Sequence, residues 1–147
     1  LIVKIPEGKY IISDQLYMYS NTKLELDKNT IIYSTASSDT TVMVIGNSID
    51  GDNESHGGYN RIQNIEISGG TWTRDTSTDS IIGAFVFWHG EDIRIHNLTI
   101  SNCTDHVINV SACKDVTITN VTIRSKNLTA ETEIQVEIIL EYSLFFR

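Results

Sequence analysis

Two stretches of the 147-residue chain, DIRIHNLTISN (92–102) and DVTITNVTIRS (115–125), match each other at a shift of 23 residues. In both, two apolar residues alternate with polar ones, a three-residue step follows, and a second alternating pair closes the unit. The anchors of the two copies are, in the same order, Ile93, Ile95, Leu98 and Ile100, then Val116, Ile118, Val121 and Ile123. Because side chains alternate along a strand, this pattern predicts two short strands separated by a one-residue kink.

The same unit recurs upstream, in NIEISGGTWTR (64–74) and in KLELDKNTIIY (23–33). Its anchors there are Ile65, Ile67, Gly70 and Trp72, then Leu24, Leu26, Asn29 and Ile31. Another apolar pair precedes the first anchor by eight and six residues, as Phe85 and Phe87, Ile108 and Val110, and Leu16 and Met18. Short repeats that cannot bury a face alone stack into a solenoid. The chain is therefore predicted to be all-β, a right-handed parallel β-helix of about six coils with three short strands each.

The kink is the second sign of stacking. Asn97 and Asn120 take the same place in consecutive copies, and Gly69 takes it in an earlier one. Asparagine and glycine both tolerate the left-handed backbone that a sharp bend needs. Stacked asparagines also hydrogen-bond to each other, so we expect a structural ladder at this corner.

Composition narrows the function classes. The chain is 40% hydrophobic and carries a net charge of −8, which fits one folded domain over residues 1–147. With so few cations, no nucleic-acid partner is expected. No apolar run is long enough to predict a membrane partner. Cys103 and Cys113 flank a predicted strand, which would hold them too far apart for a disulfide.

Three segments do not follow the apolar pattern of the repeat. Residues 46–60 are rich in Gly, Asn and Asp and predict a loop insertion, and 73–80 form a shorter loop of the same kind. The tail 137–147 is expected to cover the last coil or to pack against another copy. Uncapped strand edges at the coil ends predict self-association.

The opening residues 3–33 resemble the N-terminal entry of pectin-lyase-like β-helices, with Pro6, Gly8 and Tyr10 matching its strand. The segment TDHVINVSACKDVTITNVTI (104–123) is similar to the first catalytic coil of the polygalacturonase family of glycoside hydrolases. Thr104, Asp105, Ile108 and Val110 fit that pattern, while His106 stands where the family has glycine.

The resemblance also implies a fragment. The family's entry has a capping helix that is missing here, and its later coils carry an Asp-Asp pair, a His-Gly and an Arg-x-Lys. In this chain His89-Gly90 and Arg94-Ile95-His96 precede Asp105, in the wrong order, so no catalytic role is carried to them. We therefore expect weak or no turnover from this chain alone.

A candidate site follows from stacking the next coil on this segment. In AETEIQVEI (130–138), Ile134 and Val136 take the places of Ile108 and Val110, so Glu131 falls over Asp105 and Gln135 over Asn109. These side chains belong to adjacent coils, which are about 5 Å apart.

Three interpretations of this site stay open. Asp105 and Glu131 form the carboxylate pair that glycoside hydrolysis needs, with His106 as a further acid, base or sugar contact. Alternatively, with Glu133 they hold Ca²⁺, the one cofactor considered, which would acidify a uronate for β-elimination. Otherwise they are solvated turn acids.

Substrate contacts are predicted at Asn109, Gln135 and Trp88. The amides offer both donors and acceptors to sugar hydroxyls, and Trp88, whose parity is opposite to that of Phe87, would be a stacking platform. Trp72, Phe85 and Phe87 are expected in the core.

The sequence thus predicts an extracellular or cell-surface β-helix that acts on or binds a polysaccharide, of a uronate-rich kind, as a hydrolase or lyase. The alternative is a non-catalytic adhesin, phage tail-spike segment or glycan-binding module.

Overall fold

The computed structural model describes residues 1–37, 41–46, 58–77, 82–103, 106–124 and 134–137. Every regular element in these ranges is a strand. Accordingly, none of the described segments forms an apolar helix of membrane-spanning length. The strands are, in chain order, β1 (Ile2–Ile5), β2 (Lys9–Ile12), β3 (Leu16–Met18), β4 (Thr22–Leu26), β5 (Ile31–Ser34), β6 (Thr41–Gly46), β7 (Ile62–Ser68), β8 (Thr71–Arg74), β9 (Ile82–Trp88), β10 (Gly90–Ser101), β11 (Ile108–Ser111), β12 (Lys114–Arg124) and β13 (Ile134–Glu137).

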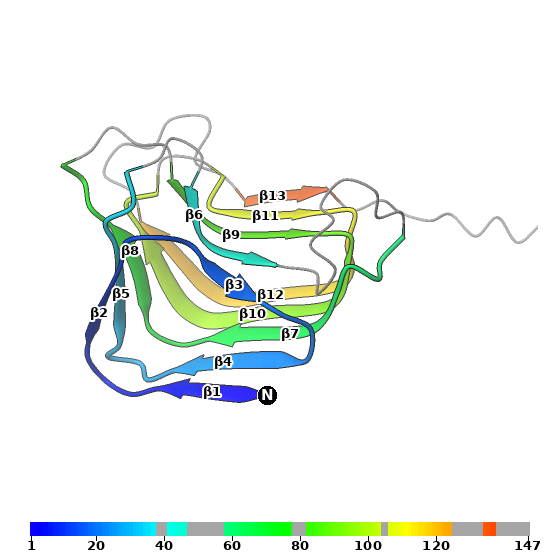
Figure 1. The fold of residues 1–147 in the computed structure, drawn as a ribbon, viewed down its shortest axis with the longest axis horizontal. Helices are drawn as coiled ribbons and strands as arrows, with labels where there is room; N and C mark the ends of the chain where they lie inside the picture. Colours follow the sequence, from blue (N-terminus) through cyan, green and yellow to red (C-terminus); the bar gives the residue numbers. More distant parts are fainter. Residues whose placement is uncertain (38–40, 47–57, 78–81, 104–105, 125–133, 138–147) are drawn as a thin grey trace, which may run out of the picture.

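These strands stack as the coils of a parallel β-helix (Figure 1). An eight-stranded sheet has the order β1-β4-β7-β10-β8-β5-β2, with β12 paired to β10, and a five-stranded sheet has the order β13-β11-β9-β6-β3. All pairings in both sheets are parallel. The predicted parallel β-helix is confirmed, although the described residues make five coils rather than about six.

The shift of 23 residues is the register of β10 with β12 and of β9 with β11. Ile93 lies opposite Val116 in the pair of β10 with β12, and Ile108 lies opposite Phe85 in the pair of β11 with β9. The copy at 64–74 is also confirmed, because β7 and β8 pair with β10 through the predicted anchors. Rows of equivalent residues therefore run straight across these coils.

The register predicted for the copy at 23–33 is wrong. Leu24 lies opposite Ile67 instead of Ile65, and Ile32, not Ile31, lies opposite Trp72. The separation from Leu24 to Ile31 is three residues longer than that between their partners Ile67 and Thr71, so one constant shift cannot describe both strands. The one-residue slip exchanges the faces of the strand, and Ile32 is 4% exposed whereas Ile31 is 37% exposed.

The core is a column of inward side chains between the two sheets. Trp72, Phe85 and Phe87 are fully buried, as predicted for these three aromatics. The rings of Trp72 and Phe85 meet edge to face, with centroids 5.0 Å apart, an arrangement that adds about 1 kcal/mol to the burial of their area. Rows of isoleucine and valine continue this packing from coil to coil.

The predicted asparagine ladder is present at the corner within β10 and β12. Asn97 and Asn120 have φ of 55° and 50°, and Asn120 Nδ2 donates a hydrogen bond of 2.8 Å to Asn97 Oδ1. Gly69 continues the column with φ of 83°. A Cβ atom at Gly69 would collide with the carbonyl oxygen of Leu26, so no other residue fits this close approach.

Both cysteines are buried free thiols, as predicted. The backbone N–H of Gly90 donates to Cys113 Sγ at 3.3 Å, and burial raises the pKa of that thiol. The described residues thus contain no disulfide.

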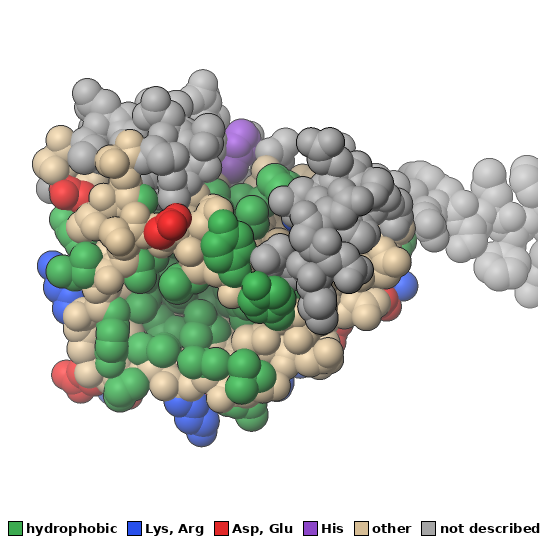
Figure 2. All heavy atoms as spheres, in the orientation of Figure 1, with side chains coloured by type: hydrophobic (Ala, Val, Ile, Leu, Met, Phe, Trp, Pro, Cys, Tyr) green, Lys and Arg blue, Asp and Glu red, His purple; other side chains and the backbone are tan. Residues whose placement is uncertain are grey.

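The first coil presents an open strand edge. Exposed hydrophobic side chains gather over this end (Figure 2), namely Leu1, Ile2, Tyr10, Ile11, Leu16, Tyr17 and Tyr19, with Ile31 of β5 in the next coil. Self-association through such an edge stays a prediction.

Three predicted segments fall wholly or partly outside the described residues. They are most of the insertion 46–60, part of the loop 73–80, and the tail 137–147 except for its first residue.

Candidate functional site

The five-stranded sheet holds two of the three predicted substrate contacts, Asn109 and Gln135, in one row, while Trp88 is in register with Ser111. In register, Tyr17, Ile45, Val86, Asn109 and Gln135 follow one another from β3 to β13. The predicted placement of Gln135 over Asn109 is therefore confirmed for the backbone of β11 and β13. The position of the Gln135 side chain lies outside what the structure describes.

Asn109 presents a polar side chain on the outer face of this sheet. It is half-buried, and its Oδ1 accepts a hydrogen bond of 2.7 Å from Ser111 Oγ, two residues along the same strand. This bond fixes the orientation of the amide, because an oxygen that accepts from a hydroxyl leaves the nitrogen as the donor end. Asn109 thus offers an oriented amide at the sheet surface.

His106 stands immediately before β11 and is half-buried. Its carbonyl oxygen lies close to Gly83 of β9, where an added Cβ would approach it to 2.6 Å. The backbone N–H groups of Ala84 and Phe85 both donate to the carbonyl oxygen of Val107, at 3.0 and 3.1 Å. Because Gly83 has no side chain, the backbone at His106 can pack closely against β9.

The predicted carboxylates Asp105, Glu131 and Glu133 lie outside the described residues. The structure describes the strands that follow these acids, β11 and β13, and pairs Ile108 with Ile134. Asp105 and Glu131 each stand three residues before one member of that pair. The stacked carboxylate pair and the alternative Ca²⁺ site both stay predictions. Within the described ranges, no three His, Cys, Asp or Glu side chains come together as a metal site.

Trp88 has the predicted parity, because it is half-buried at the end of β9 while Phe87 is fully buried. The guanidinium of Arg61 lies over its indole ring, 5.3 Å from the centroid. Arg61 is itself only 4% exposed, and burial lowers its pKa. One face of the indole is thus occupied by a cation, and a sugar ring would have to stack on the other face.

A charged network on the eight-stranded sheet escaped the sequence analysis. Glu66 of β7 contacts three basic side chains, at 2.9 Å from Lys23 Nζ, 3.5 Å from Arg94 Nη1 and 3.2 Å from His96 Nε2. Arg94 also pairs with Asp92 at 3.2 Å. The hydrogen bond from Lys23 and, to a lesser degree, that from His96 hold the pKa of Glu66 below its usual value, against the opposing effect of burial.

This network joins coils rather than marking a second catalytic centre. Lys23, Glu66 and Arg94 are in register on β4, β7 and β10. A signal was available in the sequence, since each residue directly precedes or follows an apolar anchor and their charges alternate in sign from coil to coil. Because Arg94 and His96 face outward on the eight-stranded sheet, they lie on a different sheet from His106 and Asn109.

Comparisons with known proteins agree with this architecture. A family model described as Glycosyl hydrolases family 28 matches residues 2–133. A solved structure of a candidate glycosyl hydrolase from Parabacteroides merdae ATCC 43184 is similar with a TM-score of 0.63 at 13% sequence identity. The similarity covers 84% of this chain and 59% of that protein, so the chain spans somewhat more than half the length of its structural neighbour. No curated protein matches the chain significantly.

Proposed function

Given that the chain belongs to family 28 of the glycosyl hydrolases, we propose that it acts in the hydrolysis of a uronate-rich polysaccharide, at the outer face of the five-stranded sheet. The family supports a hydrolase that acts on polysaccharide, and uronate specificity is the finer part of the proposal. Since such a substrate is a polymer found outside cells, we also propose an extracellular or cell-surface location.

The observation that carries the proposal is the register of β11 with β13. It pairs Ile108 with Ile134 and Asn109 with Gln135, and so favours equivalent positions for the two acids that precede these strands. Equivalent residues of neighbouring coils are about 4.8 Å apart. Mutual repulsion between two carboxylates at that spacing raises the pKa of one of them, which gives a proton donor beside a base.

In this arrangement Asp105 and Glu131 would divide the acid and base roles. One carboxylic acid protonates the glycosidic oxygen, and the other carboxylate assists the attack at the anomeric carbon. His106 would contact the sugar or relay a proton. Asn109 and Gln135 would bind ring hydroxyls, and Trp88 would stack on a sugar through the face that Arg61 leaves open.

The test compares cleavage of polygalacturonate by the 147-residue chain with cleavage by Asp105→Asn, in the presence and absence of Ca²⁺. The amide keeps the shape of aspartate but cannot exchange the proton, so cleavage should fall to background while the circular dichroism spectrum is unchanged. Asp115→Asn is the matched control, because Asp115 is an exposed corner residue with φ of 54° that asparagine also tolerates.

Each remaining outcome has a distinct meaning. Cleavage that is equal in Asp105→Asn contradicts the proposed role of this acid. Products with an unsaturated uronate end that form only with Ca²⁺ identify a lyase. Binding of polygalacturonate without cleavage in any condition favours glycan binding, the alternative function, for this chain.

A further inference from the structure

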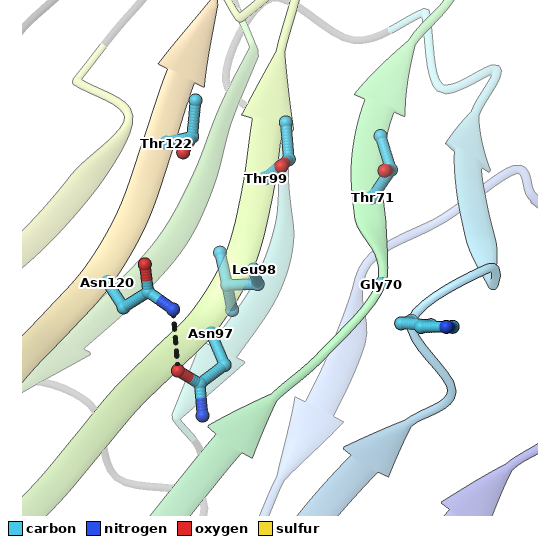
Figure 3. A pocket seen from close by; sticks show the side chains of 8 residues that line it. Gly70, Thr71, Asn97, Leu98, Thr99, Asn120 and Thr122 are labelled. Atoms are coloured by element: carbon cyan, nitrogen blue, oxygen red, sulfur yellow. Dashed lines mark hydrogen bonds between the residues drawn. The ribbon is translucent and has the colours of Figure 1, made fainter.

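A polar groove of about 210 Å³ lies at the corner between the two halves of the eight-stranded sheet (Figure 3). Its lining residues are Lys28, Gly70, Thr71, Asn97, Leu98, Thr99, Asn120 and Thr122. They come from β8, β10, β12, the connection between β7 and β8, and the connection before β5. The groove is therefore on a different sheet from β11 and β13, which carry the candidate catalytic site.

The groove is formed where the asparagine ladder stops. Asn120 stacks on Asn97 through the 2.8 Å hydrogen bond, and Figure 3 shows the two amides side by side. The next position of the column is Gly69, because its neighbour Ser68 pairs with His96. Glycine has no side chain to continue the ladder, so a space remains, with Lys28 of the preceding coil among its lining residues.

The lining offers a regular set of hydrogen-bonding groups. Thr71, Thr99 and Thr122 are in register on adjacent strands, and Figure 3 shows them as one row. Adjacent parallel strands place such hydroxyls about 4.8 Å apart. Within the described part of the chain, none of these three hydroxyls has a protein hydrogen-bond partner, so each is available to a ligand.

The charge of the groove differs from that of the whole chain. The only ionisable side chain in its lining is that of Lys28, and no carboxylate lines it, in a chain whose net charge is −8. Lys28 is exposed and forms no ion pair with the described residues. An ammonium beside hydroxyls and amides binds a ligand that has both hydroxyl groups and a carboxylate.

We propose that this groove is a second glycan-binding site, in which a short acidic oligosaccharide segment lies across the coils. The threonine hydroxyls and the Asn120 amide bind sugar hydroxyls, and Lys28 pairs with a uronate carboxylate. The uronate class of the ligand rests on the proposed function. A shallow groove of this size binds a single segment weakly, but a second contact on the same polymer raises the local concentration of substrate at the candidate catalytic site.

The experiment measures binding of a short oligogalacturonate to the 147-residue chain by NMR titration, with Asp105→Asn as the background so that no substrate is consumed. Lys28→Gln should raise Kd roughly tenfold, the scale of one lost charge-assisted hydrogen bond. Thr99→Val, which keeps the shape and removes the hydroxyl, should raise it about threefold. In the unsubstituted background, chemical-shift changes should include the amides of Thr71, Thr99 and Thr122.

Two controls match these changes away from the groove. Lys4→Gln removes one exposed positive charge from β1, and Thr117→Val removes one exposed hydroxyl from the other half of β12. Both should leave Kd unchanged. The carboxyl-reduced oligosaccharide should bind Lys28→Gln and the unsubstituted background equally, because it has no carboxylate for Lys28 to pair with.

The outcomes separate this inference from the proposed function. Equal Kd values for Lys28→Gln, Thr99→Val and the controls, or no binding at all, overturn the groove. Binding that depends on Lys28 in a protein that cleaves no polysaccharide supports the groove and contradicts the hydrolase. Cleavage by a protein whose oligogalacturonate binding ignores Lys28 supports the hydrolase and contradicts the groove.

Discussion

The two sheets of this β-helix differ in how regular their connections are. At the corner of the eight-stranded sheet, β10 and β12 bend at one asparagine each, and only Gly69 and Gly70 separate β7 from β8. The strands of the five-stranded sheet follow connections of three to nine residues, such as 13–15 between β2 and β3, 102–107 between β10 and β11, and 125–133 before β13. Short, self-similar corners fix the stacking, and long variable ones are where surface chemistry can change without disturbing it.

The largest effect is expected from Gly69→Ala, which breaks the regular corner. The new Cβ would collide with the carbonyl oxygen of Leu26 at a left-handed backbone position, so we expect a loss of at least about 3 kcal/mol in the free energy of unfolding. Urea denaturation measures it. Gly58→Ala is the control, because Gly58 also has a positive φ, of 76°, but open space around it. Equal losses would show that the collision is relieved.

Gly83→Ala tests the irregular corner beside the candidate site. Its Cβ would approach the carbonyl oxygen of His106 to 2.6 Å, so the backbone there must move, at a cost of about 2 kcal/mol. Polygalacturonate cleavage or binding should fall by more than the decrease in the fraction of folded protein. Gly46→Ala provides the comparison, because its Cβ would meet the core side chains of Phe87 and Ile62 instead. Unchanged cleavage and binding in Gly83→Ala would show that the close approach of Gly83 to His106 does not position the candidate site.

Glu66→Gln should destabilise the regular sheet in a pH-dependent way, by about 1–2 kcal/mol at pH 7. The pKa of Glu66 is lowered in the folded protein, first by Lys23. Its ionised form therefore stabilises the fold above the unfolded pKa of about 4.5, and this stabilisation is lost as pH falls through the lower folded pKa. Urea midpoints of the two proteins should converge in acid. A constant difference down to pH 2 would contradict the linkage.

The smallest effect is expected from the ladder bond. Asn120→Gly keeps the left-handed backbone and removes the amide that donates to Asn97, so the free energy of unfolding should fall by about 1 kcal/mol. A double-mutant cycle with Asn97→Gly should give a coupling of at least about 0.5 kcal/mol between these two residues. Additive losses would mean that the hydrogen bond between the two asparagines does not contribute to stability.

The sequence predicted the fold best where neighbouring coils are alike. Asn97 and Asn120 recur at one constant shift, so register, ladder and core could be deduced together. The prediction for the first copy failed at Ile31, because three more residues lie between Leu24 and Ile31 than between their paired positions in the next coil. Nothing in the local pattern shows where such extra residues are inserted. Periodicity predicts which face of the sheet a side chain occupies within one strand. It does not predict the register across a connection whose length differs between coils.

The candidate site was predicted less completely. Placing Gln135 over Asn109 needed only the periodicity of inward residues. The position of Arg61 over the ring of Trp88 could not be foreseen, since the 26 intervening residues include β7, β8, all of β9 except Trp88 itself, and the connections between these strands. Contacts between side chains of different coils depend on connection length, and these lengths vary most on the side of the molecule where the site is expected.

The parallel stacking of the coils has a mechanical consequence. Each coil is bonded only to the coils before and after it, so a force applied between the two ends of the chain would detach one terminal coil at a time. The step between β10 and β12 is 23 residues, so the detachment of that coil would release about 80 Å of extended chain. The step between β1 and β4 is 21 residues and that between β4 and β7 is 43, so the molecule would lengthen under tension in unequal increments.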